Sequence, residues 1–323
     1  MAPTSDRRDR ISRRLRLRDL HVFAAVAKAG SMTRAAAELG VTQPTVSQHV
    51  AELEAAVGQP LLDRAQTGAA PTLCGEALLR RGAEVFDVLD QGLAEVGFLA
   101  DPASGEVRIG ASESYIAGGF LAAAIDRVLR HHPRLAVRVH EANTGSLDFA
   151  GLRDRSLDAV LGRMAAADAC DDVETEVLYD EPIVFVAGAG SRWARTEGLA
   201  LRDLAAAPWI LAPPRTAVCA LVADAFRDAG LEPPTPAVTT YSMQLRMQLL
   251  ARGDYVSSLP ASLLRLNGDR WGLRALPVAS GRPLPVTVAT LRRRALAPPV
   301  RLFLDHLRAA TAALRAADVA PPP

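Results

Sequence analysis

The 323-residue sequence lacks the features that define several classes of protein. Its three cysteines, Cys74, Cys170 and Cys219, lie far apart and match no disulfide framework or metal-binding motif, so we expect them to pack as small apolar residues. No apolar run approaches the roughly 18 residues that a membrane-spanning helix needs. The basic N-terminal segment is not followed by the apolar part of a secretory signal, and we therefore expect a cytoplasmic protein.

An excess of charge of one sign is also missing, because the net charge is only +1. Hydrophobic residues make up 49% and charged residues 23% of the chain, which is typical of a folded protein, and the length favours two domains. Residues 1–72 hold ten Lys and Arg against seven Asp and Glu, whereas the remainder holds 27 against 29. The weakly basic N-terminal part is compatible with a contact to nucleic acid, which charge alone does not establish.

The N-terminal part has the pattern of three short helices. Ser31 and Thr42 are suitable N-caps for the second and third helices, and Gly58 is a suitable residue just past the end of the third. Two helices joined by a tight turn that contains glycine form the helix-turn-helix pattern. The expected ranges are about 17–29, 32–39 and 43–57, followed by a short hairpin within 59–71.

The third helix has two distinct faces. One arc is apolar and is expected to pack against the first two helices; it holds Val46, Val50, Leu53 and Val57. A second arc is small and polar and would let a DNA duplex approach; it holds Gln43, Pro44, Ser47, Gln48 and Ala51. Glutamine can bond bidentately to adenine and serine can bond a base edge, while the N–H groups at a helix start suit a phosphate. Arg34 and Arg64 are further candidates for phosphate contacts.

A long helix is predicted from about residue 72 to 100. Four of its apolar residues, spaced by 7, 4 and 7, fall on one narrow line, which favours a seam between two paired helices: Leu78, Val85, Leu89 and Val96. The alternative is a helix that lies on its own domain. The segment 101–105 (DPASG) ends the helix and is the best candidate for a domain boundary.

After residue 105, short apolar strands alternate with helical segments, which predicts an α/β domain with largely parallel sheets, as one domain or two lobes. The expected strands are 107–110, 136–140, 159–162, 183–187, 209–212, 255–259 and 286–291, and the expected helices are 115–131, 146–156, 216–229, 242–251 and 298–316. Ligands of such sheets bind beyond the carboxyl ends of the strands. Polar residues that follow strands, and that suit a small carboxylate or polyol, are Ser112, Ser114, Thr144 and Arg163.

The strings LHVFAAVA (20–27), GSMTRAA (30–36), VTQPTVS (41–47), LE (53–54), LLDR (61–64) and PT (71–72), together with Gly58 and Gly75, closely resemble the winged helix-turn-helix of LysR-type transcriptional regulators. The resemblance implies an N-terminal all-α winged helix-turn-helix with a long linker helix. It also implies a C-terminal α/β effector domain with two lobes, similar to type 2 periplasmic binding proteins. The third helix would enter the major groove of DNA, the wing would lie at the minor groove, and the linker helices would pair two subunits.

Carried onto this sequence, the resemblance implies one set of residues for DNA and another for the effector. The DNA-binding set is Ser31, Thr33, Arg34, Thr42, Gln43, Pro44, Thr45, Ser47, Gln48, Arg64 and Thr67. The effector set is Ser112, Ser114, Thr144, Arg163 and Thr216. Three departures stand out: Gln48 replaces a basic residue, the wing tip 66–68 (QTG) has no basic residue, and Glu113 at the cleft would repel an anion unless it points away. The Arg-rich tail could supply charge to DNA or be a solvated extension.

The implied domains are a basic flexible tail (1–14), a DNA-binding domain (15–72), a linker helix for dimerisation (73–101), an effector domain (105–316) and a disordered tail (317–323). The expected partners are promoter DNA, a small organic acid or sugar-related metabolite, and a second copy of the chain in a dimer or a tetramer. No membrane, cofactor or metal is expected. An enzyme is the first alternative, but no GxSxG, Walker or HExxH motif is present. A binding module for transport is the second, and the N-terminal helices argue against it.

Overall fold

The structure is a computed structural model that describes residues 15–65, 68–142, 149–164, 171–214 and 216–318. The chain divides into two compact units, Met1–Asp90 and Gln91–Pro323, and each is described by itself. The tail expected at residues 1–14 lies outside the described residues. At the other end the last helix continues to Asp318, two residues into the tail that we expected from residue 317.

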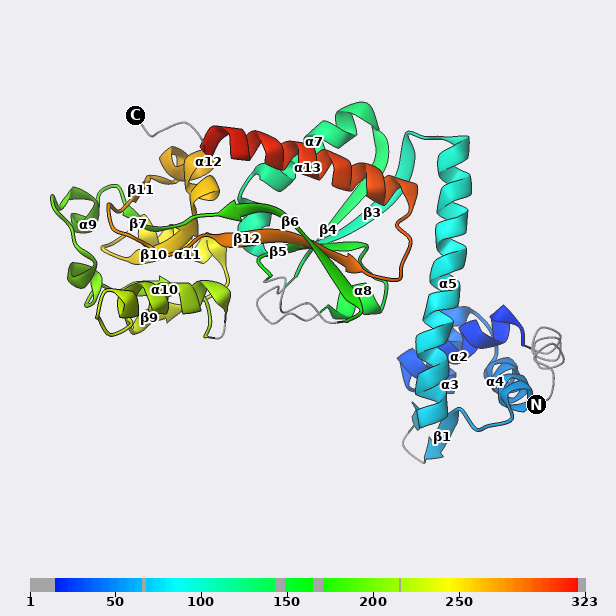
Figure 1. Cartoon of the computed structure of the whole chain (residues 1–323). Helices are drawn as coiled ribbons and strands as arrows, with labels where there is room; N and C mark the ends of the chain where they lie inside the picture. The colour runs from blue at the N-terminus through cyan, green and yellow to red at the C-terminus, as the bar shows by residue number, and fades with distance from the viewer. Residues whose placement is uncertain (1–14, 66–67, 143–148, 165–170, 215, 319–323) are drawn as a thin grey trace, which may run out of the picture. The chain divides into compact units, whose positions relative to one another are not determined.

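Helices α2 (Leu17–Ala29), α3 (Met32–Leu39) and α4 (Gln43–Val57) of the first unit confirm the predicted helix-turn-helix (Figure 1). Ser31 is the N-cap of α3 and accepts a hydrogen bond from the Arg34 N–H at 3.5 Å. The turns after α3 and α4 need a positive φ, which Gly40 (66°) and Gly58 (76°) adopt without steric cost.

Packing of the three helices buries one apolar core. Its members include Leu20, Phe23, Val26, Val46, Val50, Leu53, Leu61 and Leu62. Strands β1 (Leu62–Ala65) and β2 (Gly68–Pro71) pair antiparallel, with Leu62 opposite Pro71, and this pair is called the wing below. The predicted hairpin within residues 59–71 is therefore present.

Helix α5 (Leu73–Ala100) follows the wing, and its N-terminal part packs against the core of the first unit. A Cβ at Gly75 would lie 2.1 Å from the Leu61 carbonyl oxygen, so only glycine fits at this crossing. Leu78 is half-buried against the core of the first unit. Part of the Leu78 side chain therefore packs within its own chain, and its predicted place in a seam between subunits stays a prediction.

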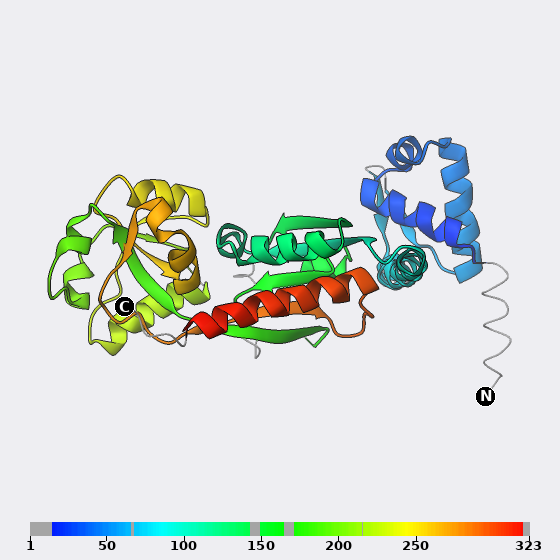
Figure 2. The ribbon, with the colours of Figure 1, turned by 90° about the horizontal axis from the view of Figure 1, so that it is seen from above.

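The second unit contains two lobes. The sheet of lobe 1 has the strand order β4-β3-β5-β12-β6, in which β3 is parallel to β4 and β5, and β12 is antiparallel to β5 and β6. Helices α7 (Phe120–His131) and α13 (Pro298–Asp318) lie side by side over one face of this sheet (Figures 1 and 2). The other elements are β3 (Ser104–Ala111), α6 (Glu113–Ala117), β4 (Arg134–Glu141), α8 (Ala150–Arg153), β5 (Ala159–Gly162), β6 (Val173–Glu181) and β12 (Leu284–Leu291).

The sheet of lobe 2 has the order β11-β7-β10-β8-β9 and an apolar cluster on each face. Phe185, Trp209 and Phe226 lie in the first cluster, and Val186, Ile210 and Leu263 in the second. Its elements are β7 (Ile183–Gly188), α9 (Arg192–Arg195), η3 (Leu201–Leu204), β8 (Trp209–Leu211), α10 (Ala217–Asp228), β9 (Pro236–Thr239), α11 (Met243–Leu250), β10 (Val256–Pro260), α12 (Ala261–Trp271) and β11 (Leu273–Ala275).

The chain passes from lobe 1 to lobe 2 between β6 and β7, and a buried carboxylate holds this crossing. Glu181 accepts hydrogen bonds from the Ser262 N–H at 3.0 Å, from the Ser262 hydroxyl and from the Tyr179 hydroxyl at 2.8 Å. Burial raises the pKa of Tyr179 above its ordinary value. The carboxylate is thus fully used within the protein and ties β6 to the start of α12.

Our prediction of largely parallel sheets is wrong, because each sheet joins antiparallel strands to a parallel set. Strands β6, β9 and β11 and helix α12 were not predicted. The sequence of β6, VETEVLYDE, has too many charges to match a buried strand, since it lies at the edge of its sheet. The helix expected over 115–131 is two helices, because the chain breaks at Gly118 and Gly119.

Candidate functional sites

The N-terminal end of α4 presents the small polar side chains that we predicted for DNA. Thr42, Gln43, Pro44 and Gln48 are exposed, and Thr45 and Ser47 are half-buried. Behind them Val46, Val50 and Leu53 are fully buried. Val57, which we also placed on the packing arc, is 39% exposed because the helix ends there.

The first turn of α4 keeps its backbone N–H groups available. Thr42 lies at the N-cap position, but its hydroxyl bonds the Thr45 hydroxyl at 2.8 Å and caps no N–H of the helix. Pro44 has no N–H to satisfy. Uncapped N–H groups with the positive end of the helix dipole suit an anion such as a DNA phosphate. Gln48 donates to Glu52 at 2.8 Å and would have to exchange this bond to reach a base.

Two contacts hold α4 in place. The His49 ring meets Asp19 of α2 at 2.7 Å (Nδ1 to Oδ1), and Glu54 accepts the N–H groups of Leu61 (2.8 Å) and Leu62 (3.2 Å) at the start of the wing. Asp19, His49 and Glu52 bring possible metal-ligand atoms within 4.8 Å of one another. Asp19 is 1% exposed, and the hydrogen bond with His49 explains how its buried carboxylate is stabilised without a metal ion.

The remaining residues predicted for DNA lie on α3 and the wing. Thr33 and Arg34 are exposed on the first turn of α3, and Ser31 is its half-buried N-cap. Arg64 lies in β1, and Thr67 lies outside the described residues.

From residue 85 onward, one side of α5 is apolar and exposed. Three of the four predicted seam residues belong to it, and with their neighbours they form what we call the α5 stripe: Val85, Val88, Leu89, Leu93, Val96 and Leu99. At helical spacing these side chains share one side of α5. All six side chains are exposed in the part of the chain that the structure describes.

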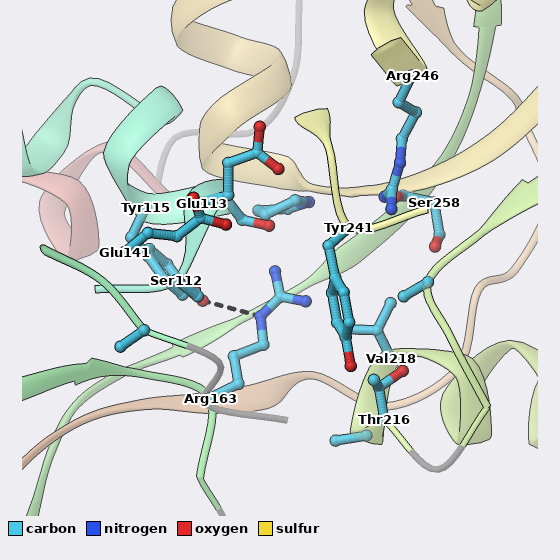
Figure 3. Close-up of a pocket in the computed structure, with 15 residues that line it drawn as sticks. Ser112, Glu113, Tyr115, Glu141, Arg163, Thr216, Val218, Tyr241, Arg246 and Ser258 are labelled. Carbon is cyan, nitrogen blue, oxygen red and sulfur yellow. Dashed lines mark hydrogen bonds between the residues drawn. The ribbon is translucent and has the colours of Figure 1, made fainter. Parts of the chain in front are cut away.

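A cavity of about 130 Å³ lies between the two lobes of the second unit (Figure 3). Four of the five residues predicted for the effector line it together, namely Ser112, Ser114, Arg163 and Thr216. The fifth, Thr144, lies outside the described residues. The Thr216 hydroxyl is engaged as the N-cap of α10, where it accepts from the Cys219 N–H at 3.2 Å.

Arg163 extends from the end of β5 into this cavity. Its Nε–H donates to the Tyr115 hydroxyl at 2.8 Å (Figure 3), and its guanidinium lies 5.7 Å from the centre of the Tyr115 ring. Burial raises the pKa of Tyr115 to about 12, so the hydroxyl stays neutral and can accept this bond. One guanidinium nitrogen, Nη2, is buried without a hydrogen-bond partner in the described part of the chain.

Arg246 enters the same cavity from α11 of lobe 2, and we did not predict it (Figure 3). The side chain is 5% exposed, and it donates from Nη1 to the Ser258 carbonyl (3.2 Å) and from Nη2 to the Thr240 carbonyl (3.1 Å). Burial lowers the pKa of Arg246 to about 10; the Glu113 carboxylate acts in the opposite direction, and the charge of Arg163 adds a smaller decrease. A lone arginine in the string SMQLRMQLL was the available indication, but helical spacing alone did not show which way it points.

Glu113 also lines the cavity, but its carboxylate is engaged. It accepts the Met243 N–H at the first residue of α11 at 2.5 Å, and so links α6 of lobe 1 to α11 of lobe 2. The carboxylate is thus directed at the N-terminal end of α11, whose dipole favours a negative charge. A second link joins the lobes where the Asn267 amide donates to the Gly118 carbonyl at 3.4 Å.

A helix with an exposed polar N-terminal turn and a two-lobed domain with a cavity lined by charged and apolar residues are compatible with a DNA-binding regulator that has a ligand-binding domain. Residues 17–76 match the family described as bacterial regulatory helix-turn-helix protein, lysR family, and residues 100–312 match the LysR substrate binding domain. The chain therefore belongs to the LysR family of DNA-binding transcriptional regulators. This confirms the resemblance, and it favours a regulator over the enzyme and the transport module.

Three curated relatives show how far the similarity extends. The chain is 27% identical to the uncharacterized regulator YdcI of Escherichia coli (strain K12) over 298 residues, which is 92% of this chain and 96% of YdcI. It is 28% identical to PcaQ of Agrobacterium fabrum over 308 residues (94% and 97%) and 27% identical to GbpR of Azospirillum brasilense over 300 residues (92% and 87%). The alignments thus span both units of the chain.

Two solved structures share the fold. The crystal structure of CbnR, a LysR family transcriptional regulator, superposes with a TM-score of 0.63 at 22% identity and covers 92% of this chain and 99% of that one. Full-length CbnR in complex with its target DNA superposes with a TM-score of 0.53 at 22% identity, over 92% and 100% of the two chains. None of the helices in the described residues is both long and apolar enough to span a bilayer.

Proposed function

We propose that the exposed first turns of α4 bind an operator in the major groove of DNA. Gln43, Pro44, Ser47 and Gln48 would face the bases, and the other predicted residues of α3, α4 and the wing would contact the backbone. The observation that carries this proposal is the division of α4 into an exposed polar N-terminal turn and a fully buried Val-Leu side. A helix held in this way presents short polar side chains at a fixed register, which is what base recognition requires.

The effector in this proposal is a small organic acid or a sugar-related metabolite that binds in the cavity between the lobes. Ser112, Arg163 and Thr216 come from three different segments and line one space of limited size. A ligand there contacts both lobes at once, so it binds one arrangement of the lobes more tightly than another. Unequal affinity for two conformations is the physical requirement for changing the geometry with which the regulator binds its promoter.

The α5 stripe is the proposed surface for self-association. Six large apolar side chains are exposed on one side of a single helix, and an apolar face of this kind is stabilised when a second α5 covers it. A dimer would carry two copies of α4, and two dimers would make the tetramer. Because the target is genomic DNA, the cytoplasm is the proposed location.

The test of DNA recognition starts with an operator selected from random duplexes with the full-length protein. Replacing Gln43 or Ser47 with alanine is expected to cost about 1–3 kcal/mol of binding free energy at that operator and to relax its sequence preference. The control is Gln248→Ala, an exposed glutamine on α11. The measurement is fluorescence anisotropy at several salt concentrations, because phosphate contacts make the affinity fall steeply with salt. Equal affinity and equal specificity of Q43A, S47A and wild type would contradict the proposed orientation of α4.

A further inference from the structure

We infer that Asp19, His49 and Glu52 bind a zinc ion, and that this ion joins α4 to α2 and releases Gln48 from Glu52. The three side chains, called the α2–α4 cluster below, each bring one possible ligand atom to within 4.8 Å of the others. Asp19 lies in the first turn of α2, and His49 and Glu52 lie on α4. The zinc site is independent of the proposed function, and only the consequence for Gln48 rests on it.

The Asp19 carboxylate is buried with much of its binding capacity unused. The residue is 1% exposed. Within the described residues, the only hydrogen bond of its carboxylate joins Oδ1 to Nδ1 of His49 at 2.7 Å. An ionised carboxylate has two oxygens and about four acceptor positions, and a buried charge is normally paired or coordinates a metal. A single neutral or charged ring nitrogen leaves Oδ2 without a partner in this part of the chain, which indicates a place for a cation.

His49 and Glu52 present two further ligands from one face of α4. Residues three apart in a helix are neighbours on its surface, and a histidine and a glutamate at this spacing are a pair with which helical proteins bind metal ions. The side chain of His49 is 15% exposed and that of Glu52 is 40% exposed. The α2–α4 cluster is therefore open to solvent on the Glu52 side, where an ion can enter.

The charge of the α2–α4 cluster favours a divalent cation. Two carboxylates share one imidazole, and the arginine paired with them in the described residues is Arg16. Its Nη1 lies 3.9 Å from Oε2 of Glu52 and its side chain is 73% exposed, so this ion pair contributes little. Without an ion, a proton joins His49 to Asp19. A divalent cation takes the place of that proton and neutralises both carboxylates.

One imidazole and two carboxylates are a ligand set that suits zinc. Zinc binds histidine nitrogen and carboxylate oxygen at about 2.0–2.2 Å, and three protein ligands with a water complete its tetrahedron. Ligand atoms of such an ion lie roughly 3.3 Å apart, so the half-exposed Glu52 side chain has to move inward by on the order of 1 Å. Magnesium and calcium prefer oxygen ligands alone. The sequence did not indicate this site, because its ligands lie on two helices and match no motif.

Binding of the ion frees a residue of the proposed DNA-binding face. The Gln48 amide donates to Oε1 of Glu52 at 2.8 Å. Glu52 has to turn toward Asp19 and His49 to reach the ion, and it then exchanges the bond with Gln48 for a bond with zinc. The exposed Gln48 amide becomes available to a base. Zinc and the operator therefore strengthen each other's binding, because the coupling between two binding sites is reciprocal.

The experiment is isothermal titration of the untagged full-length protein with zinc, magnesium and calcium chloride. It uses the variant His306→Gln, because the ring of His306 lies 5.6 Å and 6.2 Å from the ring centres of His131 and His132, and these imidazoles are a second group that attracts zinc. We expect zinc to bind with a Kd below about 10 μM. Magnesium and calcium are expected to bind at least about a hundredfold more weakly. The absence of zinc binding would overturn the inference.

Variants in the same H306Q protein locate the ion. Glu52→Gln and His49→Gln are each expected to weaken zinc binding at least about tenfold. E52Q keeps an oxygen that accepts from Gln48 and loses only a distant ion pair with Arg16, so it leaves folding intact. The matched control is Glu38→Gln, an exposed glutamate on α3, which binds zinc with unchanged affinity. Equal zinc affinity of E52Q and E38Q would show that the ion binds elsewhere.

Unfolding in urea gives a second measure of the location. A ligand that binds only the folded form stabilises the unit that holds it. Zinc is expected to raise the urea midpoint seen by circular dichroism at 222 nm and to leave the midpoint of tryptophan fluorescence unchanged, since all the tryptophans lie in the second unit. A shift of the fluorescence midpoint alone would place the ion in the second unit and overturn the inference.

Binding to operator DNA tests the release of Gln48. Zinc is expected to raise the operator affinity several-fold in the wild type and to have no such effect in Gln48→Ala. An equal effect of zinc on both proteins, or none on either, would contradict the release of Gln48. Zinc binding that depends on Glu52, in a protein for which no operator can be selected, supports the zinc site and contradicts the proposed function.

Discussion

Glu54 joins helix α4 to the wing, and its replacement offers a direct test of how the helix-turn-helix unit is held together. Its Oε1 accepts the N–H of Leu61 at 2.8 Å and of Leu62 at 3.2 Å. Both residues are buried, at 0% and 4% exposure, so water cannot replace the carboxylate without a rearrangement of the chain.

Glu54→Ala leaves two buried backbone donors without an acceptor. Each such donor costs about 1–3 kcal/mol, and some relaxation at the edge of the unit reduces the sum. We expect the first unit to lose roughly 2–4 kcal/mol of unfolding free energy. Glu54→Gln keeps an acceptor oxygen and loses only the charge, so its expected cost is about 1 kcal/mol.

The sequence provides a convenient assay, because all three tryptophans, Trp193, Trp209 and Trp271, lie in the second unit. Tryptophan fluorescence in urea therefore reports the unfolding of the second unit, and circular dichroism at 222 nm reports the helices of both. E54A should lower the urea midpoint seen by circular dichroism and leave the fluorescence midpoint unchanged. The matched control is Glu38→Ala, an exposed glutamate on α3. A circular dichroism midpoint of E54A equal to that of E38A would refute the reasoning.

Three further predictions follow from packing and charge. Gly75→Ala places a Cβ 2.1 Å from the Leu61 carbonyl oxygen and should destabilise the first unit by about 3 kcal/mol or more in the same urea assay, whereas Gly92→Ala meets nothing within 4 Å and should stabilise α5 by up to about 1 kcal/mol. Val96→Glu puts a charge in the α5 stripe and should shift the mass measured by light scattering from an oligomer toward a monomer; an unchanged mass would show that another surface holds the subunits together. Arg308 bonds Glu176 and lowers the pKa of that carboxyl below its ordinary value of 4.5. The pair therefore stabilises the fold above pH 4.5 and ceases to do so as the pH falls through the lowered pKa. Arg308→Ala should cost no more than about 1 kcal/mol at pH 7, because both groups are partly exposed, and the wild-type and mutant stabilities should converge as the pH falls below the lowered pKa of Glu176.

Helix α4 could be predicted from the sequence almost completely, since its features are local. The bounds 43–57, the proline in the first turn and Gly58 after the end all depend on neighbouring residues. The apolar arc of Val46, Val50 and Leu53 follows from helical spacing alone. Val57 was wrongly assigned to the packing arc, because the helical period does not show where the neighbouring helices end.

The lining of the cavity between the lobes was predicted only in part, for a physical reason. Ser112 and Arg163 each follow a strand, so the rule for ligands at strand ends found them. Arg246 lies within a helix, and its position at the cavity depends on how α11 packs on lobe 2. Ser258 belongs to a fully buried strand, where an unpartnered hydroxyl has no recognisable pattern in the sequence.

The sequence by itself determined the order of the domains, the helix-turn-helix and the family, because these depend on residues close together in the chain and on their periodicity. Only the tertiary structure decided which charges meet across long separations. Glu113 reaches the N–H of Met243, Glu54 turns back to the wing, and Arg163 and Arg246 share one cavity. Such contacts depend on the packing of whole elements, and no local pattern of side chains encodes the direction in which a single charged group will point.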